Sequence, residues 1–348
     1  MSDEEFEQRI RSVRAEVNDY LETVQGLIAL SHELRWDNDV KQIRPESSFT
    51  LGRRMTTSGR NRIQPNQDVT PDLTVQPYAG YGIVAEARLR FPSDEAQRME
   101  KVRQLQKYDD DLEGWNTLDG TVERSDVVLM THDDDVIKTT DYIEQAIADG
   151  RAAFSRDLSI IGCIRTTERY GNEAIRVRKA YGGLSDERLD DRLRNGRSIR
   201  LGTLSTRYSM ELYDQRPPPA HMLSVMWMTI LPVLVQEDQY IRARGEGPPL
   251  VRITAEDLTA RMRKALNPSM GAERSPGYPQ QAWVREALDD MCRLRYAKRL
   301  GDEYEVAYRV IRDPQETFIK GVCRLERERE KRESKRALKQ TPQLKLFD

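Results

Sequence analysis

The chain has 348 residues, enough for two or three domains of roughly 100 to 200 residues each, so a single small module is excluded. Its 56 Lys and Arg nearly balance its 58 Asp and Glu, and the net charge of −2 predicts no global attraction to nucleic acid. Three widely spaced cysteines exclude a disulfide framework and a zinc cluster. With no signal peptide and no run of about 20 apolar residues, a soluble, cytoplasmic protein without membrane contact is expected.

The first half of the chain alternates between helix and strand patterns. Apolar residues at helical spacing predict a long helix over residues 4–35, and a strand is predicted at Phe49–Leu51. The elements predicted next are strands at Leu73–Gln76, Gly82–Phe91 and Asp126–Met130, helices from Ser93 and Thr139, strands at Leu158–Arg165 and Ala174–Tyr181, a helix at Asp186–Leu193 and a strand at Ser198–Leu204. This pattern predicts a mixed α/β domain over residues 1–216.

A second module is predicted from Pro217, because three successive prolines stop both helix and strand. Its predicted elements are helices at Met222–Ile241, Ala255–Leu266 and Gln280–Leu294, a Gly- and Pro-rich linker at Gly245–Pro249, and paired strands at Tyr296–Leu300 and Tyr304–Val310. The apolar run within its first helix is interpreted as a buried core helix. Over residues 217–313 the order resembles a winged helix-turn-helix domain. The alternative is a protein-interaction or dimerisation domain.

Residues 314–340 are predicted to form a charged helix. Its acids and bases are interleaved at helix-neighbour spacing, which favours a solvated spacer over a nucleic-acid-binding arm.

A pair of facing carboxylates is predicted in the hairpin around Pro77–Tyr81. Centring the hairpin on Ala79 places Asp72 directly opposite Glu86. Alternation along the second strand puts Glu86, Arg88 and Arg90 on one face, with Ile83, Ala85, Ala87, Leu89 and Phe91 on the other. Like charges that face each other destabilise a strand pair, so a hard cation, Mg²⁺ or Mn²⁺, is expected between them.

The motif order over roughly residues 5–150 resembles the PD-(D/E)XK nuclease superfamily. Its elements here are Pro71-Asp72, Glu86-Ala87-Arg88, the helical stretch Gln104 to Tyr108, typical of the RecB-like branch, and the strand Asp126–Met130. The resemblance implies a restriction-endonuclease-like mixed sheet core, beside the α+β winged-helix domain and the charged C-terminal helix. It also implies that Asp72 and Glu86 hold metal and that Gln104 and Tyr108 approach the substrate backbone.

One residue departs from that pattern. Where the superfamily has Lys, this chain has Arg88, which cannot exchange a proton at neutral pH but can stabilise phosphate charge as a bidentate donor. Lys101 or Lys107, on the next helix, could replace the missing amine. Three readings stay open: a metal-dependent nuclease, a DNA-binding descendant that no longer cuts, and a solvated hairpin without a site.

Other acidic groups are interpreted as structural. Glu22 and Glu33 are candidates for an additional acid from the first helix but are interpreted as exposed helix charges. The acids that follow His132 are interpreted as satisfying the start of the next helix. The chain carries no complete dinucleotide fingerprint and no phosphate-binding Gly-Lys-Ser/Thr loop.

Two regions are predicted to contact DNA. One leads into the hairpin and the other opens the last helix of the second module, whose start would meet base edges. The residues are Arg53, Arg54, Arg60 and Arg62 in the first region, and Gln280, Gln281 and Arg285 in the second. Trp283 is interpreted as a packing residue.

The final residues, 341–348, contain the pentapeptide Gln-Leu-x-Leu-Phe. Gln343, Leu344, Leu346 and Phe347 closely resemble the motif by which bacterial replication and repair proteins bind the sliding clamp. The alternative is a tail that folds back onto its own domain. Together these features predict a nucleoid-associated Mg²⁺-dependent DNA nuclease of repair, replication or defence, or a non-cleaving adapter with the same fold.

Overall fold

The computed structural model forms two compact units. We call Leu21–Gln215 with Gly271–Tyr278 the sheet unit, and Met1–Tyr20, Arg216–Met270 and Pro279–Asp348 the helical unit. The residues that the structure describes are 1–37, 41–44, 46–59, 66–115, 122–156, 158–168, 171–203, 212–213, 215–236, 240–241, 248–266 and 278–340.

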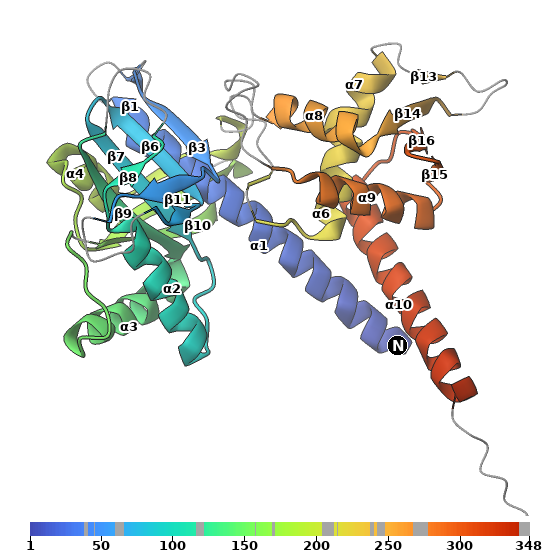
Figure 1. Ribbon diagram of the computed structural model, residues 1–348, viewed down its shortest axis with the longest axis horizontal. Helices are drawn as coiled ribbons and strands as arrows, with labels where there is room; N and C mark the ends of the chain where they lie inside the picture. Colours follow the sequence, from blue (N-terminus) through green and yellow to red (C-terminus); the bar gives the residue numbers. More distant parts are fainter. Residues whose placement is uncertain are drawn as a thin grey trace, which may run out of the picture. The chain divides into compact units, whose positions relative to one another are not determined.

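The sheet unit (Figure 1) is built on a mixed sheet. Its seven described strands have the order β12-β11-β10-β9-β7-β6-β3. Strands β3, β6 and β7 are antiparallel neighbours, whereas β9 runs parallel to both β7 and β10. Strands β11 and β12 extend the other edge in antiparallel fashion. The bounds are β3 Ser48–Leu51, β6 Leu73–Tyr78, β7 Tyr81–Ala87, β9 Arg124–His132, β10 Leu158–Thr167, β11 Glu173–Tyr181 and β12 Arg197–Arg200.

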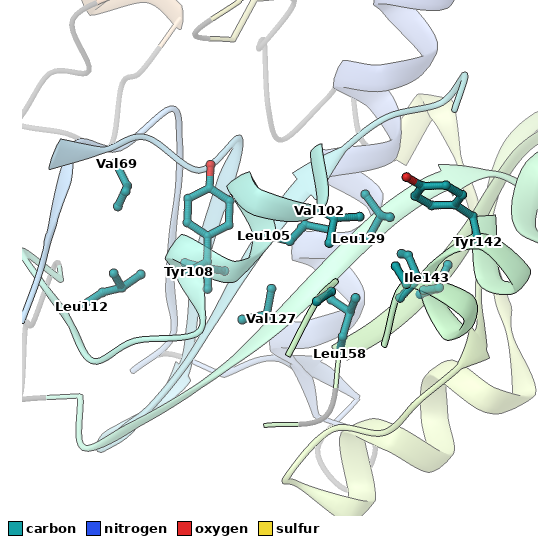
Figure 2. Close-up of a cluster of buried hydrophobic side chains, with 14 of the residues drawn as sticks. Val69, Val102, Leu105, Tyr108, Leu112, Val127, Leu129, Tyr142, Ile143 and Leu158 are labelled. Atoms are coloured by element: carbon teal, nitrogen blue, oxygen red, sulfur yellow. The ribbon is translucent and has the colours of Figure 1, made fainter. Parts of the chain in front are cut away.

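Helices cover both faces of this sheet. Helices α2 (Glu95–Tyr108) and α3 (Val136–Ala148) pack on one face through the apolar cluster drawn in Figure 2. The second half of α1 (Asp3–Arg35) packs on the other face, where a Cβ on Gly26 would lie 2.7 Å from Cys163 Sγ. Every residue of β7 is consequently buried, so the face that carries Glu86 meets α2 rather than solvent.

The predicted hairpin register is confirmed next to the acids. Leu73 pairs with Ala85 and Val75 with Ile83, the same register that sets Asp72 opposite Glu86. The register shifts beyond Val75, and the turn is the two residues Ala79 and Gly80, with Gly80 at φ +82°. Strand β7 ends at Ala87, so the prediction that it continues to Phe91 is wrong.

Most other element boundaries in the sheet unit lie close to their predicted positions. Asp94 caps α2 by accepting a hydrogen bond from Gln97 N. Helix α3 begins at Val136 rather than Thr139, and β12 ends at Arg200 rather than Leu204. The remaining elements are β1 Trp36–Asp37, β2 Gln42–Ile43, β4 Met55–Thr57, β5 Asp68–Val69, β8 Leu112–Glu113, the 3₁₀ turn η1 Asp133–Asp135 and α4 Glu187–Asn195.

The helical unit combines helices with a small sheet. Its helices are α6 Pro219–Val225, the π-helical turn η3 Met226–Ile230, α7 Leu231–Gln236, α8 Ala255–Leu266, α9 Gln281–Arg293 and α10 Pro314–Gln340. The sheet has the order β13-β14-β16-β15, with β13 Tyr240–Ile241, β14 Leu250–Thr254, β15 Ala297–Leu300 and β16 Glu303–Ala307. Strand β14 was not predicted, and the first helix ends at Gln236 rather than Ile241.

The predicted core helix is buried within the helical unit. Pro219–Gln236 is long and apolar enough to cross a membrane, but 61% of it is buried inside the protein. Trp227 packs against the rings of Tyr296, Tyr308 and Phe318, and its Nε1 donates to the Arg309 carbonyl oxygen. This aromatic cluster joins η3 to α10 and to the residues that flank the β15–β16 hairpin.

The first turns of α10 belong to the same core. Phe318 and Ile319 are fully buried, so the interpretation of this helix as a solvated spacer is wrong for its first half. Ion pairs join it to the start of α1, with Arg9 Nε 2.8 Å from Glu326 Oε2 and Arg14 Nη2 2.9 Å from Glu316 Oε1. The first 20 residues therefore belong to the helical unit, and the prediction that they are part of the first domain is wrong.

Two glycines of the sheet unit make a matched test of how tightly β10 and β11 are joined. Gly182 and Gly171 both have positive φ, but a Cβ on Gly182 would overlap the Leu158 carbonyl oxygen, whereas one on Gly171 would meet nothing within 4 Å. We expect Gly171→Ala to lower the free energy of unfolding by about 1 to 2 kcal/mol. Gly182→Ala should cost about 1 to 3 kcal/mol more, because backbone must move. Urea unfolding of both variants measures this, and equal losses would contradict the close approach.

Candidate functional site

Two buried carboxylates lie together where β6 begins and β7 ends. Asp72 immediately precedes β6 and is 2% exposed, and Glu86 is the penultimate residue of β7 and is 1% exposed. The hairpin register places them opposite one another, as predicted. Two charges this deeply buried require compensating partners.

Asp72 receives hydrogen bonds from three directions. Ala87 N donates to its Oδ2 over 2.8 Å, and Arg88 Nη1 lies 3.3 Å from the same oxygen. Gln215 Nε2 donates to Oδ1 over 3.2 Å. The carboxylate is therefore fixed between the end of β7 and a segment far along the chain.

Arg88 places one guanidinium among three oxygens. Its Nη1 contacts Asp72 Oδ2 and donates to the Ala87 carbonyl oxygen over 2.6 Å, while its Nη2 forms an ion pair with Glu86 Oε1. That Glu86 oxygen is buried and accepts no hydrogen bond with regular geometry from the described residues. The three oxygens of Asp72, Glu86 and Ala87, which we call the oxygen cradle, thus converge on a single cation.

A chain of hydrogen bonds along α2 holds the other oxygen of Glu86. Tyr108 Oη donates to Glu86 Oε2 over 3.0 Å, Gln104 Nε2 donates to Tyr108 Oη over 3.1 Å, and Lys101 Nζ donates to Gln104 Oε1 over 3.3 Å. In Figure 2 the Tyr108 ring lies against the apolar cluster with its hydroxyl pointing away from it. Tyr108 is 1% exposed, so it positions Glu86 rather than approaching a substrate.

The electrostatics of the site follow from burial and from the close charges. Burial, and then the Asp72 carboxylate, raise the pKa of Glu86 to about 8 against the opposing effect of Arg88. Burial disfavours the charged form of Arg88, but Glu86 and Asp72 outweigh it and raise its pKa. Burial and the nearby Arg88 lower the pKa of Lys101. Lys101 therefore belongs to the electrostatic neighbourhood of the site.

The oxygen cradle has the chemistry of a magnesium or manganese site. Two carboxylates and a carbonyl are the hard oxygen donors that these cations prefer, and Mg²⁺ is commonly held by one or two carboxylates. Glu86 Oε1 is buried, accepts no regular hydrogen bond from the described residues and is paired with Arg88, whose contact a metal ion would have to replace. Among the described residues no group of three or more His, Cys, Asp or Glu side chains surrounds one point. The donor set fits a cation that keeps several water ligands.

The other candidate acids have partners outside the oxygen cradle. Glu33 is 3% exposed and lies 3.8 Å from Arg197, so its interpretation as an exposed charge is wrong. Glu22 accepts a hydrogen bond from Arg165 N and lies 3.7 Å from His132. His132 accepts from Asp134 N at the start of η1, and Asp133 lies 3.6 Å from Arg178.

The predicted DNA-contact residues that the structure describes belong to both units. Arg53 donates to the Gly114 carbonyl oxygen, and the exposed Arg54 forms an ion pair with Asp68. Gln280, Gln281 and Arg285 are exposed at the start of α9 in the helical unit, and Trp283 is buried as expected. Arg60, Arg62, Gln343, Leu344, Leu346 and Phe347 lie outside the described residues.

Sequence reasoning missed two participants. Gln215 contacts Asp72 across 143 positions, and Tyr213 interacts electrostatically with Arg88. A single amide and a single phenol form no spacing pattern in the sequence. The one feature that could have drawn attention to them is their position directly before the three prolines.

Comparison with protein-family models, with curated proteins and with solved structures finds no match. Function has to be inferred from the residues and their geometry.

The contribution of Arg88 to pairing with Asp72 and Glu86 can be measured through the free energy of unfolding. Arg88→Met should lower the free energy of unfolding by about 3 to 5 kcal/mol in the presence of chelator, because it leaves two buried carboxylates without their cation. Adding Asp72→Asn and Glu86→Gln should recover most of that loss, since the amides carry no charge. Arg90→Met, two residues along on the exposed end of the segment, is the control and should change little. A triple variant no more stable than Arg88→Met would contradict charge compensation.

Proposed function

We propose that the chain is a Mg²⁺- or Mn²⁺-dependent DNA nuclease whose active site is the oxygen cradle. The observation that carries the proposal is the convergence of Asp72, Glu86 and the Ala87 carbonyl on one cation. Burying two acids beside one another costs free energy, which favours the interpretation that they are kept for a function, and a cation held by two carboxylates is typical of phosphodiester hydrolysis.

The order of the motifs along the fold supports the same proposal. The acids lie on the β6–β7 hairpin, Gln104 and Tyr108 lie on the following helix α2, and β9 returns parallel to β7. This is the order on which the resemblance to the PD-(D/E)XK superfamily depends, and the restriction-endonuclease-like fold remains part of the proposal.

Each residue of the site has a proposed task. Asp72 and Glu86 would hold the divalent cation, which polarises a phosphate and lowers the pKa of a water molecule. Arg88 offers a planar bidentate donor for phosphate oxygens. Gln104 and Tyr108 orient Glu86, and Lys101 adds positive charge beside the cradle.

Cleavage is the direct test. We expect the full chain to cut DNA, from a panel of duplex, single-stranded and branched substrates, with Mg²⁺ or Mn²⁺ and not with chelator. Asp72→Ala and Glu86→Ala should each lower the rate at least a hundredfold, because each removes a metal ligand, and Arg88→Lys should retain or raise it. Asp134→Ala, an exposed acid away from the cradle, is the control. Both alanine variants cutting like the parent would remove this site from the proposal.

A DNA-binding protein that does not cut is the second candidate, favoured by the hold of Arg88 on both carboxylates. In the helical unit, α8, α9 and the β15–β16 hairpin follow one another as in a winged helix, with Gln280, Gln281 and Arg285 exposed at the start of α9. Salt-dependent DNA binding weakened by Arg285→Ala, without cleavage under any condition, would favour this adapter. Glu286 on the same helix pairs with Arg216 and limits the positive charge of this face.

The tail is proposed as a tether to the bacterial sliding clamp, which would place the protein at DNA in the cytoplasm. Leu344, Leu346 and Phe347 would fill an apolar groove and Gln343 would fix register. A short flexible peptide should bind with a dissociation constant on the order of micromolar, about −8 kcal/mol.

Calorimetry of purified clamp with the full chain, and with its Leu346→Ala/Phe347→Ala variant, measures this interaction. The variant should bind at least tenfold more weakly, because it loses two anchors. Lys345→Ala is the matched control, since that position is unspecified in the motif. Equal binding by the variant and the parent, or no binding by either, would exclude the tether.

A further inference from the structure

We propose that Arg88 is the resident cation of the oxygen cradle and that a phosphodiester must draw it away before a divalent cation binds. Nucleic acid and metal would then bind in that order and strengthen one another. The inference rests on the proposed function and adds to it a coupling between substrate and metal.

The contacts of Arg88 carry the first step. Its guanidinium touches all three oxygens of the cradle, at 3.3 Å from Asp72 Oδ2 and 2.6 Å from the Ala87 carbonyl, and in an ion pair with Glu86. A cation bound to the same oxygens has to displace these contacts. In the free protein the affinity for a divalent cation is therefore reduced by the free energy of breaking them.

Charge supplies the second step. A divalent cation that approached while Arg88 stayed would meet its positive charge, and that of Lys101, which interacts electrostatically with both acids. Once Arg88 has left, the two acids lose the positive charge that lowers the pKa of Glu86, and a dication that binds there supplies positive charge again.

Access supplies the third step. The Arg88 side chain is 16% exposed while those of Asp72 and Glu86 are 2% exposed, so Arg88 is the member of the trio that reaches solvent. A phosphate offers the guanidinium two oxygens in the fork geometry that a carboxylate pair offers it. When a phosphate replaces the two carboxylates as its partner, Arg88 remains paired with an anion.

Binding of Mn²⁺, followed by the electron paramagnetic resonance signal of the free ion, tests the coupling without measuring cleavage. The full chain is titrated with and without a short oligonucleotide, and the Asp72→Asn/Glu86→Gln variant measures the Mn²⁺ held by DNA alone. Without DNA, Arg88→Met should bind Mn²⁺ at least tenfold more tightly than the parent, and Arg90→Met should match the parent. DNA should raise the affinity of the parent at least tenfold and leave that of Arg88→Met nearly unchanged.

Melting temperatures give a second readout where Arg88→Met folds poorly. Mn²⁺ should raise the melting temperature of Arg88→Met more than that of the parent, because the metal replaces the lost cation.

The outcomes separate the two proposals. If DNA leaves the Mn²⁺ affinity of the parent unchanged while the cradle binds the ion, the coupling is wrong and the nuclease proposal stands. If neither the parent with DNA nor Arg88→Met binds more Mn²⁺ than the Asp72→Asn/Glu86→Gln variant, the cradle is no metal site and both proposals fail.

Discussion

The pairing of Arg88 with two buried carboxylates is the constraint on which the rest of the site depends. Asp72 and Glu86 are enclosed because helices cover both faces of the sheet, and a carboxylate cannot stay ionised in such a place without a partner. Arg88 supplies that partner from the residue directly after the end of β7, two positions beyond Glu86, and its guanidinium contacts both carboxylates. The hairpin, the helix α2 and the segment at Gln215 can all be understood as holding this trio in place.

Different elements of the fold hold Asp72 and Glu86 in place. Backbone from β7 fixes Asp72 through Ala87 N, and α2 fixes Glu86 through Tyr108, whose own hydroxyl is oriented by Gln104. Residues at helix spacing i, i+3 and i+7 form that chain, so a single helix face sets the position of one carboxylate oxygen. Such support from regular elements is what a site needs if its geometry is to be held within a fraction of an ångström.

The parts of this arrangement that are local could be predicted from sequence. The predicted turn, centred on Ala79, differs from the observed two-residue turn, which by itself would set Asp72 opposite Ala87. The register predicted beside the acids is nevertheless observed, because a shift between Val75 and Tyr78 offsets the difference. The helix bearing Gln104 and Tyr108 could be predicted from its sequence pattern. The burial of Phe318 and Ile319 was missed because the surrounding charges dominate the pattern, although apolar residues recur at helical spacing there. The contact between Gln215 and Asp72 could not be predicted, because one amide far away in the sequence produces no periodic signal. Strand β14 was missed because it is short and follows a Gly- and Pro-rich stretch.

Arginine in place of lysine changes the resting state of such a site more than its ability to bind anions. A lysine ammonium is a compact point charge, whereas the guanidinium spreads its charge over a planar fork whose donors can meet several oxygens together. Here those oxygens belong to two carboxylates and a carbonyl. The guanidinium, whose geometry suits a phosphate, therefore also pairs with the acidic groups of the protein itself. Under the proposed exchange, the donor geometry that lets Arg88 hold these three oxygens is also the geometry that lets a phosphate compete for the guanidinium.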